Sequence, residues 1–328
     1  MSDRQTLKIE IGHRSVIFII FLLLSLKFIS AIQSILISVF IAYLISTAVY
    51  PLVNILHRFK IPTSLSALVI LSSVIIGLLA TLASILPVVI TQTSALINKL
   101  PILLEQLGNY NIDSNFLTNQ IGSFSANILR FAADTLSITI MTFTLFVISF
   151  YFIQERSNLD ARLRYLFGDK SERAKKLILE IETQLGNWVR TIITLMFIVG
   201  ILNYLGFRLI SLEYALPLAV IAGILELIPN IGPIVATIPA TIVGFAISPF
   251  HGVMVLSISF LVQQLENSVL VPGLMKNSTG LHPVITIIAL LIGYKTGGAL
   301  LAVLSLPFVL VGKIVLSHLY ENKFTFYS

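Results

Sequence analysis

Two glutamates stand in stretches of sequence that are otherwise apolar. Glu226 and Glu266 are each flanked by residues expected at or near membrane depth. There an ionised carboxylate costs at least about 3 kcal/mol and has to face protein or water. Such an acid either takes part in transport or, as a protonated or hydrogen-bonded group, locks two helices together. Glu226 also fits a span end at the membrane interface.

Polar side chains surround Glu266. Gln263, Gln264 and Asn267 lie within one helical turn of it, and the three- and four-residue spacing places Gln263, Glu266 and Asn267 on one face of a helix. In lipid such a patch either holds helices together or lines a route for a hydrogen-bonding solute. We favour the route, because several polar groups gather there.

Proline and glycine interrupt the two apolar stretches that carry these acids. Proline removes a backbone donor, so carbonyl groups are left unpaired where hydrocarbon offers no partner. A pair of broken apolar segments predicts a transporter binding site. Two extramembrane turns are the alternative, since Asn230 and residues 276–279 favour turns. The breaks are Pro229, Gly232, Pro233 and Pro239 in the first stretch, and Pro272, Gly273, Gly280, Pro283, Gly293, Gly297, Gly298 and Pro307 in the second.

Composition decides the fold class. The 328 residues are 56% hydrophobic and only 11% charged, and the mean hydropathy is +0.97. Several uncharged runs exceed the roughly 20 residues that a helix needs to cross a bilayer. They are continuously apolar and do not alternate as barrel strands do. We therefore predict an all-α integral membrane protein of about eight transmembrane helices, with Pro/Gly-broken segments, re-entrant or spanning, in the carboxyl-terminal half; the spans are 16–29, 31–56, 64–90, 135–153, 188–207, 213–228, 249–271 and 297–319.

Five regions follow from this segmentation. The first two spans are expected to form a tight hairpin at Lys27. Leu177, Leu185 and Trp188 continue one apolar stripe, so the charged helix is expected to run without a break into the fifth span. The regions are three amino-terminal spans (1–90), an extracytoplasmic amphipathic arm (91–134), the fourth span (135–153), a cytoplasmic charged helix (154–187) and a carboxyl-terminal transport region (188–328).

The arm carries one apolar stripe at helical spacing. The stripe predicts a helix that rests on the membrane or on a neighbouring subunit, with ligand binding as the lesser reading. Its residues are Leu117, Ile121, Phe124, Ile128 and Phe131.

Lys and Arg gather before the first span, after the second and after the fourth. By the positive-inside rule both termini are expected in the cytoplasm. The prediction is a multi-pass protein of the cell (inner or plasma) membrane, with the lipid bilayer as a partner.

Other chemistry finds little support. The chain has no cysteine, so thiol catalysis and cysteine metal sites are excluded. The five histidines are scattered, and no enzyme or phosphate-loop motif occurs. The net charge is +6, but acidic residues are interspersed among the basic ones in the charged segment. They weaken the positive field there, which argues against a nucleic-acid partner. We expect no cofactor, no metal and no enzymatic activity, and transport would draw on a gradient.

Two blocks of sequence resemble a known family. Residues 225–233, Leu-Glu-Leu-Ile-Pro-Asn-Ile-Gly-Pro, continuing to Ile238-Pro239-Ala240, are similar to the Pro-(aromatic or Asn)-Ile-Gly-Pro signature of the autoinducer-2 exporter family. The second block, Gln263-Gln264-Leu265-Glu266-Asn267, Val271-Pro272, Leu281-His282-Pro283 and 293–307, resembles the carboxyl-terminal pattern of that family. The chain departs from the pattern at Leu301 and at Ser305-Leu306-Pro307, which puts the helix packing there in doubt.

The resemblance implies a multi-span exporter of small polar molecules that forms a homo-oligomer, with a pentamer as one form. Autoinducer-2 is the name-giving solute, and some relatives are proposed sodium/proton antiporters.

We therefore expect a secondary transporter of a small polar solute, with Glu226 or Glu266 coupling a proton. A cation/proton antiporter that uses protons and sodium is the first alternative, and a passive oligomeric scaffold is the second. The expected site comprises Glu226, Pro229, Asn230, Gly232, Pro233, Gln263, Gln264, Glu266, Asn267, Pro272, His282 and Pro283.

Overall fold

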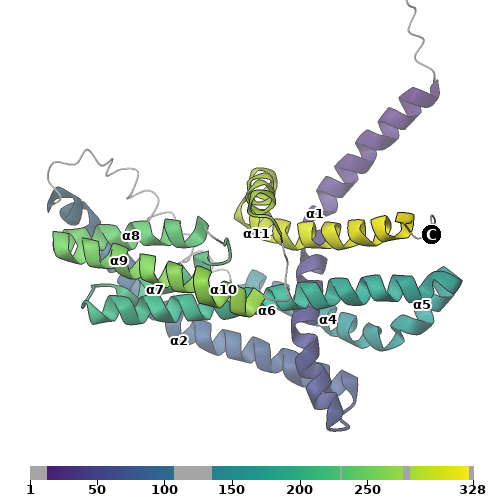
Figure 1. The fold of residues 1–328 in the computed structure, drawn as a ribbon, viewed down its shortest axis with the longest axis horizontal. Helices are drawn as coiled ribbons and strands as arrows, with labels where there is room; N and C mark the ends of the chain where they lie inside the picture. Colours follow the sequence, from purple (N-terminus) through teal and green to yellow (C-terminus); the bar gives the residue numbers. More distant parts are fainter. Residues whose placement is uncertain (1–12, 107–134, 230, 276–280, 325–328) are drawn as a thin grey trace, which may run out of the picture.

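The computed structural model describes residues 13–106, 135–229, 231–275 and 281–324, and it is all-α, as predicted (Figure 1). Within these residues five helical stretches are long and apolar enough to cross a membrane, and two shorter apolar helices accompany them. The long stretches are Ser30–Arg58, Thr63–Ile85, Ser137–Leu209, Pro249–Leu274 and Val284–Leu319, and the short helices are Ala215–Leu225 and Ile231–Ile247.

The amino-terminal half begins with a single long helix. Helix α1 (His13–Arg58) is continuous over 46 residues, so the predicted hairpin at Lys27 is wrong. The sequence around Lys27 holds no proline or glycine that would end a helix, and one lysine can extend its side chain toward water without a break. The basic residues before and after α1 therefore precede and follow the same helix. Counting them does not establish on which side of the membrane the amino terminus lies.

The next helices are longer or more divided than expected. Helix α2 (Thr63–Gln106) continues past the expected boundary at residue 90, and the stripe of the predicted arm lies outside the described residues. Helix α4 (Thr135–Glu155) is followed by a 3-10 turn, η1 (Arg156–Asn158), a short helix, α5 (Leu159–Phe167), and a second 3-10 turn, η2 (Gly168–Lys170). Gly168, with φ of +53°, turns the chain at that point, because glycine adopts this conformation without steric cost.

Helix α6 (Ser171–Leu209) runs from the charged segment through Trp188 without a break, as predicted. Its first half packs with α1 and with the final helix, α11 (Pro283–Phe324), through Leu185, Ile192 and Leu310. Helices α1, α2 and α4 form a separate apolar cluster around Val53 and Ile153. Helix α6 therefore joins the amino-terminal helices to the carboxyl-terminal half.

An arginine of α6 replaces a backbone hydrogen bond that α1 lacks at its proline. Pro51 lies inside α1 and has no N–H for the carbonyl of Thr47, four residues earlier. Arg190 of α6 donates from Nη1 to the carbonyl oxygens of Thr47 (3.3 Å) and Ala48 (2.9 Å). The helices approach so closely here that a Cβ at Gly186 would lie 2.5 Å from the Thr47 oxygen.

Arg190→Met is expected to lower the free energy of unfolding by about 2 to 3 kcal/mol, because the buried carbonyls of α1 lose a charged donor. The measurement is thermal unfolding of the detergent-solubilised protein. In the double variant with Pro51→Ala the loss should shrink, since residue 51 then supplies its own N–H. If the losses in the free energy of unfolding caused by the two changes were purely additive, Arg190 would not be compensating for Pro51.

The carboxyl-terminal half contains two short helices joined by a reversal. Helix α7 (Ala215–Leu225) has 11 residues and α8 (Ile231–Ile247) has 17, so they extend about 17 Å and 25 Å, less than a 30 Å hydrocarbon core. The expected span 213–228 is thus a half-length helix. Val243, near the end of α8, packs in the same cluster as Phe207 and Leu212, so α8 returns to the end from which α7 started.

The tip of this α7–α8 hairpin lies beside the middle of the apolar part of α6. A Cβ at Gly223, near the end of α7, would lie 2.7 Å from the carbonyl oxygen of Met196 in α6. Figure 1 shows α7, α8 and α9 running alongside the same half of α6. The hairpin therefore has the form of a re-entrant segment.

Ser248 caps the start of helix α9 (Pro249–Leu265), because its hydroxyl accepts from the backbone N–H of His251. It continues through a π-helical turn, η3 (Glu266–Leu270), into α10 (Val271–Met275). The hydroxyl of Thr191 in α6 donates to the carbonyl of Leu274 (3.4 Å), so this composite helix follows α6 beyond the hairpin tip.

Helix α11 is bent at two glycines. Gly297 and Gly298 have non-helical dihedral angles, and Gly298 has φ of +69°. Figure 1 shows the two arms of α11 pointing in different directions. The expected last span, 297–319, is therefore only the second arm.

Candidate functional site

Glu226 lies at the tip of the α7–α8 hairpin, directly after the last residue of α7. Its side chain is fully buried (0% exposed), and neither carboxyl oxygen has a hydrogen-bond partner among the described residues. The first turn of α8 closes over it, because a Cβ at Gly232 would lie 1.8 Å from the carbonyl oxygen of Leu225. Only glycine permits this approach.

Glu266 opens the π-helical turn that follows α9, and it is 2% exposed. Turns of this kind inside helices often mark functional sites. Nε2 of Gln263 donates to Oε2 of Glu266 at 3.4 Å. The carboxyl group of Glu226 lies near that of Glu266, close enough for the two groups to influence each other electrostatically. We call these two residues the acid pair.

If the acid pair were ionised, no described residue would balance its charge. No described Lys or Arg forms an ion pair with either carboxyl. A buried ionised carboxylate without a partner costs several kcal/mol, and two adjacent ones repel each other. In this conformation the pair is therefore stable when its charge is neutralised by a proton or by a small cation.

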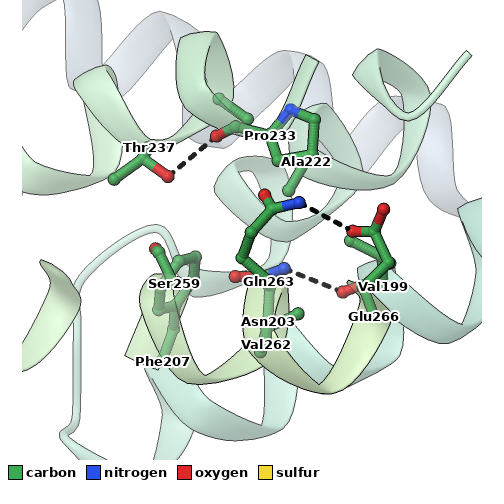
Figure 2. A pocket seen from close by; sticks show the side chains of 11 residues that line it. Val199, Asn203, Phe207, Ala222, Pro233, Thr237, Ser259, Val262, Gln263 and Glu266 are labelled. Carbon is green, nitrogen blue, oxygen red and sulfur yellow. Dashed lines mark hydrogen bonds between the residues drawn. The ribbon is translucent and has the colours of Figure 1, made fainter. Parts of the chain in front are cut away.

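A cavity of about 10 Å³ adjoins Glu266 (Figure 2). Such a volume accommodates one water-sized particle. Four helices and the π-helical turn enclose it: Val199, Asn203 and Phe207 of α6, Ala222 of α7, Pro233, Ala236 and Thr237 of α8, Ser259, Val262 and Gln263 of α9, and Glu266.

Two polar side chains around this cavity donate to backbone carbonyls of their own helices, which leaves their oxygens as acceptors. Nδ2 of Asn203 donates to the carbonyl of Val199 (2.9 Å), and the hydroxyl of Thr237 donates to the carbonyl of Pro233 (2.8 Å). The amide oxygen of Asn203, the hydroxyl oxygen of Thr237 and Glu266 remain to accept. Acceptor oxygens around a cavity of this size could bind a protonated water molecule or a hard cation.

The structure brings together part of the expected site. Glu226, Gly232, Pro233, Gln263 and Glu266 lie at the hairpin tip and the end of α9.

The other expected site residues lie apart from the cavity. Gln264, Asn267 and Pro272 are exposed, and Pro229 is half-buried in the turn. His282 is exposed and accepts from the backbone N–H of Val284 (3.3 Å). Pro283 begins α11, and Asn230 lies outside the described residues.

Sequence reasoning missed three polar residues of the cavity wall: Asn203, Thr237 and Ser259. Asn203 gave a usable signal, because a lone amide at the centre of an apolar span has to face protein. Thr237 and Ser259 gave none, since their hydroxyls can bond to the carbonyls of their own helix.

Long apolar helices, a half-length hairpin and a buried acid pair define a multi-pass membrane protein of the transporter class. Comparison with known proteins agrees. The family described as AI-2E family transporter matches residues 16–321, and the chain belongs to this family.

Its relatives carry names of the same class. "Putative transport protein YrrI" of Bacillus subtilis is 25% identical over 304 residues, covering 86% of this chain and 84% of the relative. "Putative transport protein YueF" of the same organism is 29% identical over 291 residues, covering 80% and 78%. A "Putative transport protein" of Methanothermobacter thermautotrophicus is 23% identical over 239 residues, covering 67% and 71%. The protein is thus a membrane transporter.

Proposed function

We propose that the protein is a secondary transporter that exports a small polar solute and couples the export to protons at the acid pair. The observation that supports this is a pair of buried carboxyls, unbalanced by any described ion pair, at the tip of a half-length hairpin. A proton neutralises the pair while the site is dry. The proton leaves when the tip moves and water reaches the carboxyls from the other side.

The solute route is closed in this conformation. The cavity beside Glu266 measures about 10 Å³, which leaves no room for a solute larger than water. Passage requires the hairpin tip to separate from α9, and the same separation would hydrate the acid pair. One movement would then expose both the solute and the coupling group.

The test compares the extracellular metabolites of a deletion strain that carries wild-type protein, Glu226→Gln or an empty vector. Wild-type protein should raise a small polar metabolite outside the cell, and Glu226→Gln should reduce this export by at least about tenfold, because the amide cannot carry a proton. Glu172→Gln, an exposed acid of α6, is the matched control and should export normally. Identical profiles with wild-type protein and empty vector would refute export, and full export by Glu226→Gln would remove the acid pair from the mechanism.

Cation/proton antiport is the second candidate. It is favoured by the size of the cavity and by the acceptor oxygens of Asn203, Thr237 and Glu266 that surround it. Sodium-dependent proton movement in everted vesicles, with no change in exported metabolites, would select this candidate over solute export.

A further inference from the structure

A second and larger cavity lies away from the acid pair, where α1, α4, α5 and α6 meet. Its volume is about 160 Å³. A cavity of about 150 Å³ is large enough for a molecule the size of benzene, so this one suits a solute of roughly six to ten non-hydrogen atoms. The lining residues are Tyr43, Ser46, Thr47, Tyr50, Phe152, Ile153, Glu155, Arg156, Leu159, Ile178 and Glu182.

Two opposite charges are fixed on the wall of this cavity. Nη2 of Arg156 lies 3.0 Å from Oε2 of Glu182, and the two side chains are only 20% and 11% exposed. The guanidinium of Arg156 also lies over the ring of Tyr50, 3.5 Å from the ring centre. An ion pair this far from water adds little stability by itself, but it presents a positive and a negative group at defined positions on the cavity wall.

The remaining wall consists of two tyrosines, Tyr43 and Tyr50, together with acceptor oxygens and apolar surface. The hydroxyls of Ser46 and Thr47 donate to the carbonyls of Tyr43 and Leu44 (2.7 and 2.9 Å), so their oxygens are left to accept. A second carboxylate, Glu155, is held from outside the cavity by Arg162. The apolar part of the wall is formed by Phe152, Ile153, Leu159 and Ile178.

These groups match the chemistry of one ligand class. A ligand carboxylate complements Arg156, and a ligand ammonium complements Glu182, Glu155 and the hydroxyl oxygens. A simple anion would meet two carboxylates, and a simple cation would meet the guanidinium. A ligand that carries both charges can place its carboxylate beside the guanidinium and its ammonium beside the carboxylates, so neither charge is repelled. A short aliphatic group on the ligand would contact the apolar part of the cavity wall.

We propose that this cavity binds a small aliphatic zwitterion of the α-amino-acid type. The proposal goes beyond the transport function and does not depend on it, because binding can be measured without transport. The cavity beside Glu266 is too small to bind the same ligand.

The test is the thermal unfolding midpoint of the purified full-length protein in detergent, with L-valine as the probe. A bound ligand raises the midpoint in a saturable manner. Two fragments of valine are the matched controls: isovalerate, which lacks the ammonium, and isobutylamine, which lacks the carboxylate. We expect a saturable rise with valine, and at least about a tenfold higher concentration of either fragment for the same rise.

Variants separate binding in this cavity from other causes. Arg156→Gln and Glu182→Gln should remove the response to valine, whereas Lys175→Gln, which removes an ion pair with Asp160 outside the cavity lining, should retain it. Ile178→Trp narrows the cavity and keeps both charges, so it should weaken the response to valine even if the charge variants fold poorly. No midpoint rise with valine in the wild-type protein, or an undiminished response in Ile178→Trp, would overturn the proposal. Neither outcome bears on the acid pair or on export.

Discussion

Replacing Glu266 by glutamine is expected to reduce proton-coupled flux in proteoliposomes by on the order of a hundredfold, to the level of empty vesicles. Glutamine has the same shape and can still accept the hydrogen bond from Gln263, which now measures 3.4 Å. It cannot take up or release a proton. Any solute flux that remains should follow the solute gradient alone and should not respond to an imposed pH gradient.

Two controls isolate the acid pair in this experiment. Gln264→Ala changes the exposed neighbour of Gln263, and Glu172→Gln removes an exposed carboxylate of α6. Both should transport like the wild-type protein. Undiminished flux in Glu266→Gln that still depends on pH would exclude this residue as the coupling group.

Gly232→Ala is expected to lower the free energy of unfolding by about 3 kcal/mol and to abolish transport. The added methyl group would lie 1.8 Å from the carbonyl oxygen of Leu225 and 2.5 Å from its carbonyl carbon. Both atoms belong to the backbone of α7, so no side chain can rotate to make room. Helix α8 would have to move away from α7 and would open the closure over Glu226.

Thermal unfolding in detergent measures this effect, and Gly312→Ala is its matched control. A Cβ at Gly312, inside α11, would meet no atom within 4 Å. That substitution should be neutral or should stabilise the protein by up to about 1 kcal/mol, since alanine favours helix over glycine. An unchanged unfolding midpoint in Gly232→Ala would show that α7 and α8 are not held this closely.

Hydropathy is sufficient to predict that the protein is a helical membrane protein, but it does not predict the length of each helix. Lys27 suggests a break in an apolar stretch, yet the residues around it have no helix-ending signal, and α1 continues through it. The stretch that holds α7 is apolar enough for a span. Its actual length depends on packing of Gly223 and Gly232 against neighbouring backbone, which composition does not record.

The sequence predicts the two residues of the acid pair but not that they lie close together. Each glutamate is conspicuous as a charge in apolar sequence, but the proximity of residues 226 and 266 depends on how α9 packs against the α7–α8 hairpin. Asn267 shows the limit of helical spacing. Four residues after Gln263 it should share the same face, but the π-helical turn that begins at Glu266 adds a residue to the turn and Asn267 is exposed.

Side-specific thiol labelling tests the central claim most directly, namely that the hairpin tip seals a site that opens to each side in turn. The chain has no cysteine, so a single introduced thiol is the only one present. Thr237→Cys lies on the cavity wall, and Asp169→Cys is an exposed control in η2. With a membrane-impermeant reagent, Thr237→Cys should be protected at rest. Opposite proton and solute gradients should make it reactive from one side and then from the other, while Asp169→Cys reacts from a single side throughout. Reaction of Thr237→Cys from one fixed side under every condition would contradict the proposed mechanism.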